Sequence, residues 1–313
     1  MRPRTPALLL VLAAGAGPLL PAWLVSIATV ALANGLVVLG LVVLWRAGLV
    51  PFGQALFYAS GAYAVALLSR RFGSTDAFLS VAVGAVAGGA CAFLVGALLA
   101  RYREIFFAML SLALSMILYG VLVKTQSLGS TDGFNVAGAT FFGREPTLVS
   151  RPLALYWLAA AVAAAAIVGV GFYFRSVAGA LCVPIRDNEI RVEYLGLSVT
   201  RLVHLQIVLG GILAGAGGSL AALTIGHVDP SMSYWTTSGG FVFVTILSGS
   251  TSVVTPFLGA LLFELVRTAA VAFAPTSWQF VMGCALLATI VFLPEGLASL
   301  RTRLRLPAWG RSP

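Results

Sequence analysis

A succession of long apolar segments constrains this chain more than any other feature of its sequence. The hydrocarbon core of a bilayer is about 30 Å thick, so a helix that crosses it needs about 20 apolar residues. A mean hydropathy of +1.01 over the full length leaves no polar stretch long enough for a soluble catalytic domain. We therefore predict an all-α fold, a polytopic transmembrane helical bundle of about ten spans, with residues 1–313 as a single transmembrane domain. The predicted segments are 7–20, 23–45, 55–68, 77–100, 105–123, 153–174, 202–225, 241–247, 253–273 and 278–293.

The first apolar segment resembles a signal peptide, because Arg2 and Arg4 precede the apolar residues 7–20. Pro18 and Pro21, however, lead straight into another apolar run and not into a soluble domain. We expect the segment to be retained as a short first span.

Two other segments are interrupted by residues that break helices. The segment 55–68 follows the glycine-containing turn 48–53, and the segment 241–247 lies between glycines and Pro256. Broken helices at membrane depth are tolerated where they face protein or a water-filled cavity, and transporters build substrate paths from them. We therefore predict broken or re-entrant segments in both halves of the chain, and we interpret the glycines of 210–218 as helix-packing positions. The residues expected on a translocation path are Gly53, Gln54, Gly239 and Gly240.

A polar island, residues 175–201, separates two long apolar segments. It contains four arginines and three acidic residues, in a chain of which only 9% is charged. Because a charge near the bilayer midplane costs at least ~2.5 kcal/mol, the polar island must project into water. Pro184 and Gly196 are typical of the first turn and the end of a helix, so we predict one short amphipathic helix over 184–196. This helix is either a docking surface for a soluble protein or a solvated connection between two spans.

Charge spacing supports the predicted helix. Arg186 lies three residues before Glu189, and Asp187 lies four residues before Arg191, so we expect two ion pairs along it. The opposite stripe consists of Ile185, Asn188, Val192 and Leu195.

The basic residues predict the orientation in the membrane. Placing the polar island in the cytoplasm puts its four arginines, the N-terminal arginines and the basic tail 294–313 on that side. Membrane proteins concentrate Lys and Arg in cytoplasmic loops, so we expect both termini in the cytoplasm. The net charge of +9 then belongs to one membrane face and does not indicate binding of nucleic acid.

Motifs of hydrolytic and nucleotide-binding enzymes are missing from the sequence. It has no HExxH or GxSxG motif, and its three cysteines are far apart without a metal-binding pattern. A phosphate-binding loop needs Gly-Lys followed by Ser or Thr, whereas the single lysine, Lys124, lies in Leu-Val-Lys-Thr. We expect no enzymatic activity, no cofactor and no metal site, so any use of ATP requires a separate ATPase subunit.

Ionisable residues are scarce inside the apolar segments. Glu264 is the one candidate for proton or sodium coupling, and we expect Arg267, one turn further on, to pair with it. We expect His204, near Arg201 at the start of a span, to be structural. This scarcity favours coupling to an ATPase through the polar island over an ion-coupled secondary carrier or channel, which stays the alternative class.

Residues 176–196, SVAGALCVPIRDNEIRVEYLG, carry a resemblance to a known family. They are similar to the cytoplasmic motif of LivM-type permeases of branched-chain amino acid ABC importers, which reads close to S-x-x-G-R-A-L-R-A-I-R-E-N-E-x-x-A-E-A-L-G. The similarity continues, in order, at GLVPFGQALFYASGAY (48–63), FAMLSLALSMI (107–117), GSTDG (129–133), 249–259 and LPEG (293–296).

This resemblance implies a multi-pass permease subunit in the bacterial inner membrane. It would form a heterodimer with a second, homologous permease, and would work with two cytoplasmic ATPase subunits that bind ATP and with an extracytoplasmic solute-binding protein. The solute would be a branched-chain amino acid or a similar small polar molecule, and urea- or amide-type importers have closely similar permeases. The positions that match the motif, and that would contact the ATPase, are Arg186, Asp187, Asn188, Glu189, Glu193 and Gly196; Ala180, Val183 and Pro184 depart from it.

Overall fold

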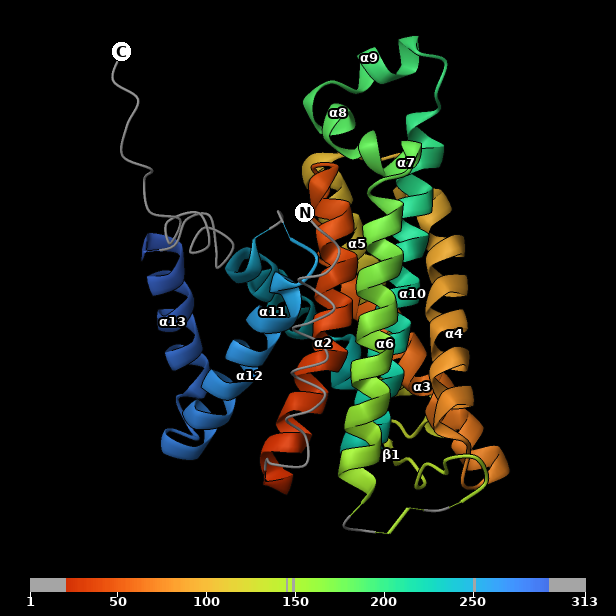
Figure 1. Cartoon of the computed structure of the whole chain (residues 1–313), viewed down its shortest axis with the longest axis vertical. Coiled ribbons are helices and arrows are strands. Elements are labelled where there is room, and N and C mark those ends of the chain that lie inside the picture. Colours follow the sequence, from red (N-terminus) through yellow and green to blue (C-terminus); the bar gives the residue numbers. More distant parts are fainter. Residues whose placement is uncertain (1–20, 145, 148–149, 250–251, 293–313) are drawn as a thin grey trace, which may run out of the picture.

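Helices make up most of the computed structural model, which describes residues 21–144, 146–147, 150–249 and 252–292 (Figure 1). Every segment predicted from residue 23 onward coincides with one of these helices. The predicted first span, 7–20, and the basic tail, 294–313, lie outside the described residues. The principal helices are α2 (Ala22–Arg46), α3 (Gln54–Phe72), α4 (Ala77–Leu99), α5 (Glu104–Lys124), α6 (Arg151–Tyr173), α10 (Val199–Ile225), α11 (Trp235–Ser248), α12 (Thr255–Phe273) and α13 (Trp278–Phe292).

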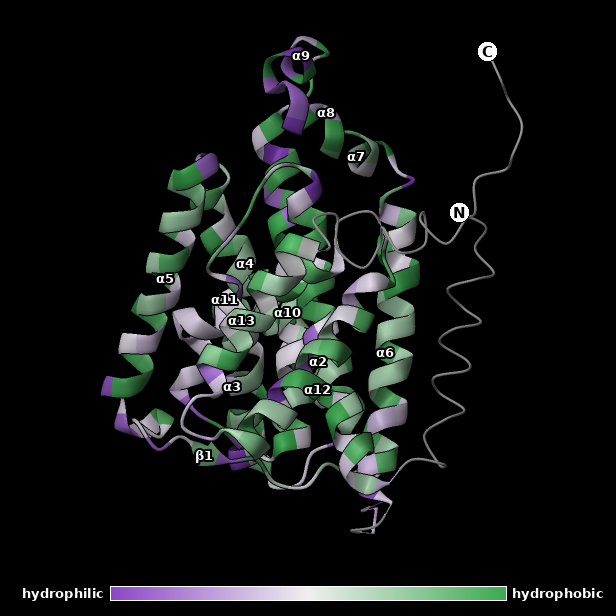
Figure 2. Cartoon of the chain, turned by 90° about the vertical axis from the view of Figure 1, so that its left-hand side faces the viewer, coloured by the Kyte–Doolittle hydropathy of each residue, from purple (hydrophilic) through white to green (hydrophobic). Residues whose placement is uncertain are grey.

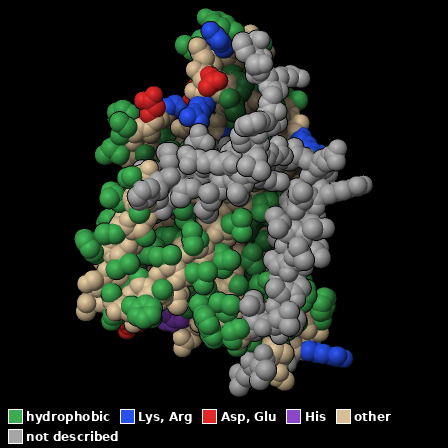
Figure 3. All heavy atoms as spheres, turned by 60° about the vertical axis from the view of Figure 1, so that its left-hand side comes forward, with side chains coloured by type: hydrophobic (Ala, Val, Ile, Leu, Met, Phe, Trp, Pro, Cys, Tyr) green, Lys and Arg blue, Asp and Glu red, His purple; other side chains and the backbone are tan. Residues whose placement is uncertain are grey.

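Six helices of the described residues are long and apolar enough to cross a membrane, namely α2, α4, α5, α6, α10 and α12. Hydrophobic residues follow the length of the bundle, and hydrophilic residues gather at its two ends (Figure 2). Apolar side chains also dominate the flank seen in Figure 3. The chain is therefore a helical multi-pass membrane protein, as its hydropathy predicts, while the number of ten spans stays a prediction.

Short elements occupy the two ends of the bundle. The polar island forms α7 (Val177–Ala180), α8 (Cys182–Asp187) and α9 (Glu189–Tyr194), which stand at one end in Figure 1. At the other end, β1 (Phe134–Asn135) pairs antiparallel with β2 (His227–Val228). This pairing joins the loop between α5 and α6 to the loop between α10 and α11. The remaining short elements are η2 (Gln126–Leu128) and η3 (Pro230–Ser233).

Helix α10 lies at the centre of the packing, and glycines let its neighbours approach closely. Gly215 of α10 lies against Gly61 of α3 and against Gly84 and Gly88 of α4, so closely that a Cβ atom at any of these positions would overlap a neighbouring backbone or side chain. Small residues permit such contact between backbones, and it is a main source of helix association in bilayers. The packing role predicted for the glycines of 210–218 is confirmed.

The single helix predicted over 184–196 is wrong. Two helices, α8 and α9, replace it because Asn188 is extended (φ −163°, ψ 103°) and its Oδ1 accepts a hydrogen bond from the Arg191 backbone amide at 3.2 Å. An asparagine that caps a helix begins a new one and cannot continue the last. Among the described residues neither expected ion pair, Arg186–Glu189 or Asp187–Arg191, is formed, and Glu189 instead pairs with Arg103, the residue before α5.

Other features of the predicted helix are present. Ile185 and Val192 are buried as the stripe predicts, whereas Asn188 and Leu195 are exposed. Gly196 follows α9 with φ +79°, the left-handed conformation expected of a glycine just past a helix.

The contact between α3 and α10 leads to a testable prediction. Gly61→Ala places a methyl group into the Gly215 backbone, so we expect a loss of about 1–3 kcal/mol in the free energy of unfolding. Gly169→Ala on α6 is the control, because the space around Gly169 is open and alanine favours a helix. Thermal unfolding of detergent-solubilised protein measures both variants. Equal melting temperatures would contradict the close packing.

Candidate functional site

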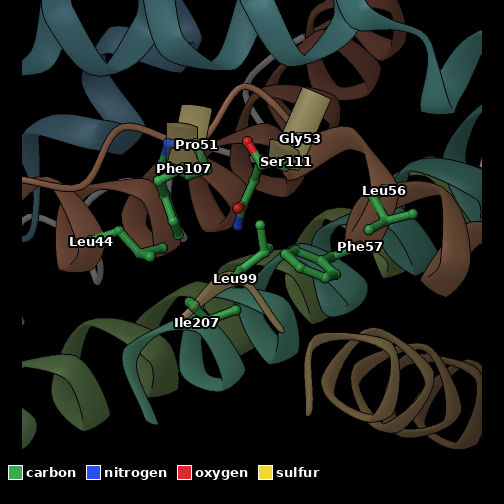
Figure 4. A pocket seen from close by; sticks show the side chains of 10 residues that line it. Leu44, Pro51, Gly53, Leu56, Phe57, Leu99, Phe107, Ser111 and Ile207 are labelled. Carbon is green, nitrogen blue, oxygen red and sulfur yellow. The ribbon is translucent and has the colours of Figure 1, made fainter. Parts of the chain in front are cut away.

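The chain is not helical between the end of α2 and the start of α3, and α5 holds this first interruption in place. The backbone amide of Phe52 donates a hydrogen bond to Ser111 Oγ at 3.0 Å. Gly53 lies so close to the Ser111 carbonyl that no Cβ atom would fit there, and Figure 4 shows the two residues side by side. Within the bilayer no water can satisfy a free backbone amide, so a side chain must replace the missing helical partner.

The second interruption, between α10 and α11, is held by the same helix one turn further on. Ser115 Oγ of α5 donates to the backbone carbonyl of Ser233, the last residue of η3, at 2.7 Å. Ser115 lies near the middle of α5, so the η3 turn lies well inside the span. Both serines are buried. Their spacing of four residues places them on one face of a helix, and this is the signal by which the sequence could have identified them.

The two interruptions also contact one another. The backbone amide of Ala55, in the first turn of α3, donates to Ser238 Oγ of α11 at 3.0 Å. We call residues 52–55, Ser111, Ser115 and 233–240 the junction. Sequence reasoning identified the interruption before α3. It placed the second interruption between Gly239 and Pro256, whereas Gly239 and Gly240 lie inside the continuous helix α11 and the irregular segment precedes this helix. It also missed the three serines that hold the two interruptions.

All four predicted path residues lie in the junction, but they differ in environment. Gln54 is fully buried, and its Nε2 donates to the Gly210 carbonyl of α10 at 3.1 Å. Gly53 is packed without free space, whereas the positions of Gly239 and Gly240 leave room for a methyl group. The structure thus brings the four residues to one region, and their contact with a solute stays a prediction.

The cavity beside the junction is small and mostly apolar. Its volume is about 10 Å³, roughly the space of one water molecule (Figure 4). A solute of amino-acid size cannot pass through it in this conformation. The residues that line the cavity are Leu44, Pro51, Gly53, Gln54, Leu56, Phe57, Leu99, Phe107, Ser111 and Ile207.

The buried carboxylate of Glu264 ties α12 to α2. Asn34 Nδ2 donates to Glu264 Oε1 at 2.8 Å, and Arg267 Nη1 lies 3.6 Å from the same oxygen. The predicted Glu264–Arg267 pair is confirmed, but Asn34, which lies 230 positions away, is a partner that the sequence did not indicate. His204 Nε2 lies 3.0 Å from the Phe93 carbonyl, a contact between α10 and α4 that fits the structural role expected of it.

The polar island presents an exposed surface with apolar and charged side chains. Ile190 and Tyr194 of α9 are 62% and 86% exposed, and Leu195 beside them is 72% exposed. Large apolar side chains gathered at a hydrophilic end of a protein are typical of an interaction site. Among the predicted contact residues, Arg186, Asp187, Asn188, Glu193 and Gly196 are exposed, whereas Glu189 is partly covered by its pairing with Arg103.

Arg186 and Cys182 connect the polar island to the bundle through contacts with the turn after α2 and with α10. The Arg186 side chain lies over Gly48, which has φ +78° in the turn that follows α2. The Cys182 side chain is buried, and Gln206 of α10 donates to its sulfur at 3.3 Å. Burial raises the pKa of the Cys182 thiol, so this side chain stays protonated and unreactive near neutral pH. Among the described residues, no His, Cys, Asp and Glu side chains group as metal ligands would.

Comparisons with known proteins agree on one family. A family model described as "Branched-chain amino acid transport system / permease component" matches residues 23–290. The high-affinity branched-chain amino acid transport system permease proteins LivM of Salmonella typhimurium (strain LT2) and Escherichia coli (strain K12) are each 26% identical over 306 residues. Each alignment covers 90% of this chain and 72% of the relative. No solved structure matches the chain.

The junction predicts different effects for two of its glycines. Gly53→Ala forces its methyl group into the Ser111 backbone, so we expect a loss of about 1–3 kcal/mol in the free energy of unfolding. Gly240→Ala should be nearly neutral, because the closest atom, on Phe263, would lie 3.8 Å from the new Cβ. The yield of monodisperse protein and its melting temperature in detergent check both variants, and a harmless Gly53→Ala would show that α5 does not pack against the interruption as described.

Proposed function

The chain belongs to the family of branched-chain amino acid transport system permease components, and we propose that it is the transmembrane permease subunit of an ATP-driven ABC importer. The observation that carries this proposal is the family match, which runs from α2 to α13 and includes the polar island. The names of the similar proteins support a branched-chain amino acid, or a similar small polar solute, as the transported molecule.

The proposed arrangement in the membrane follows the charges. The polar island and both termini lie in the cytoplasm, and about ten spans cross the bacterial inner membrane. The polar island is rich in arginine and lies at one end of the bundle, which supports this orientation (Figure 2). The β1–β2 pair and its loops then lie on the outer side, where a solute-binding protein would deliver its cargo.

The proposed partners supply what this chain lacks. A second, homologous permease completes a heterodimer, and two cytoplasmic ATPase subunits bind ATP, since the sequence has no phosphate-binding loop. The exposed apolar side chains of α9 support docking of the ATPase at the polar island, because burial of Ile190, Tyr194 and Leu195 would favour binding. The coupling contacts proposed at Arg186, Asp187, Asn188, Glu189, Glu193 and Gly196 lie on or beside the same surface.

The junction is the part of the chain that we propose opens during transport. Its cavity of about 10 Å³ is too small for a solute, so the packing around Gly53 and Gln54 must loosen before anything passes. Three hydrogen bonds that involve serine hydroxyls hold the junction: Ser111 and Ser238 accept from backbone amides and Ser115 donates to a carbonyl, and such bonds are worth about 0.6 kcal/mol each in a membrane protein.

Cysteine crosslinking tests the docking surface. In a variant without Cys91 and Cys284, single cysteines at Ile190 and Tyr194 should crosslink to co-expressed ATPase subunits in a nucleotide-dependent way. Cysteines at Ile185 and Val192, both 1% exposed, are the controls and should not react. Native Cys182 stays in place because it is buried and protonated. An intact complex without a crosslink at either exposed position would reduce the polar island to a connection between spans.

Glu264 separates this function from an ion-coupled carrier. Glu264→Gln keeps an oxygen that accepts from Asn34, so we expect near-normal ATP-dependent uptake. Glu264→Leu leaves the buried Asn34 amide without its partner and should cost about 1–3 kcal/mol of stability. Uptake assays in membranes and thermal unfolding measure the two effects. Loss of uptake in a correctly inserted Glu264→Gln variant would argue for ion coupling and against the proposed function.

A further inference from the structure

An ion pair joins the polar island to the start of α5. Arg103 Nε donates to Glu189 Oε1 of α9 at 2.5 Å, and Arg103 Nη1 donates to the carbonyls of Ala100 and Tyr102 at 2.7 and 2.8 Å. The guanidinium is thus fixed on the loop between α4 and α5 while it reaches across to α9. Among the described residues, the only other salt bridge is Glu264–Arg267, which lies within α12.

The backbone beside Arg103 is strained. Glu104, the first residue of α5, has φ +50°, a left-handed conformation that costs a residue with a Cβ atom roughly 1–3 kcal/mol. Such a conformation persists only where the surroundings impose it. Two hydrogen bonds of Arg103 stay within the loop, to Ala100 and Tyr102, and the third reaches Glu189 of α9, so the strained residue lies directly beside the one ion pair that joins this loop to α9.

Helix α5 connects this point to the junction. From Glu104 to Ser115 the helix is continuous, and a helix of this length spans about 17 Å. Ser111 and Ser115 hold the interruptions before α3 and α11. A displacement of α9 that Arg103 passes to α5 therefore reaches both interruptions together.

We propose that Arg103 is a positioning residue that transmits movement of the docked polar island through α5 to the junction. This inference rests on the proposed function, because it requires an ATPase at the polar island. Arg103 and Glu189 are partly exposed, 25% and 35%, at a solvent-facing end of the bundle, so solvent screens the pair and its contribution to folding stability is modest. Loss of the pair should consequently affect the coupling of ATP hydrolysis to transport and leave the fold intact.

Reconstitution of the whole importer in proteoliposomes tests this inference. Arg103→Glu places two acids opposite each other, so the number of solutes moved per ATP hydrolysed should fall by about fivefold or more. The melting temperature of the complex should stay that of the wild type. The exchanged pair Arg103→Glu with Glu189→Arg should raise the ratio well above that of either single variant.

Arg101→Glu is the matched control. Arg101 is exposed, lies in the same loop and carries the same charge, but no salt bridge of the described residues includes it. Its reversal should leave the ratio of transport to hydrolysis unchanged. A change as large as that of Arg103→Glu would mean that the charge of the loop matters and not the Arg103–Glu189 pair, and would overturn the inference.

The remaining outcomes are equally decisive. An unaltered ratio in Arg103→Glu, or no recovery in the exchanged pair, would overturn the inference while the proposed function stands. A fall in melting temperature that accounts for the lost uptake would make Arg103 merely structural. If the wild-type complex shows no ATP-dependent uptake, the proposed function itself fails, and the inference fails with it.

Discussion

The bilayer contains no water that could satisfy free backbone groups, and the junction depends on this constraint more than on any other. Two stretches of the chain leave the helical conformation inside the bundle, before α3 and before α11. Backbone amides and a carbonyl that lack a helical partner there form hydrogen bonds with the hydroxyls of Ser111, Ser115 and Ser238. Irregular backbone at membrane depth is stable only with such replacements. Few residues of α5 other than these two serines are buried, so the hydrogen bonds to the irregular backbone are a main part of what positions α5.

Two kinds of packing divide the bundle into a firm part and a part that is easier to rearrange. Helices α3, α4 and α10 meet through glycines, where backbones touch and any displacement creates either overlap or a void. Helix α5 is attached mainly by one narrow stripe and a few hydrogen bonds. Hydroxyl hydrogen bonds can be exchanged one by one at low cost, whereas a packed glycine seam moves as a unit or not at all. A permease needs both properties, since part of it must open while the rest keeps the bundle assembled.

Hydropathy predicts where the helices of this chain lie but cannot predict which of them meet. Apolar length located each principal helix from residue 23 onward, and charge located the polar island, because both depend on local composition. The Ala55–Ser238 and Asn34–Glu264 contacts join residues that are 183 and 230 positions apart. The spacing of apolar and polar residues along a sequence does not predict contacts at such a separation. Asn188 shows a different limit. Its neighbours have the spacing of one amphipathic helix, yet its side chain bonds the Arg191 amide and starts another, so local capping overrode the pattern.

The polar island combines two interactions with different physical roles. Its exposed apolar side chains supply affinity for a partner, because burial of apolar area is favourable and nearly independent of direction. The Arg103–Glu189 pair adds little to the affinity for a partner. It links one point of α9 to one end of α5, so it fixes how these two helices lie relative to one another. A docking surface that bound tightly without such a link would hold an ATPase without moving the junction. The proposed role of the link rests on two positions along α5: the strained Glu104 next to Arg103, and the serines further along the helix that hold both interruptions.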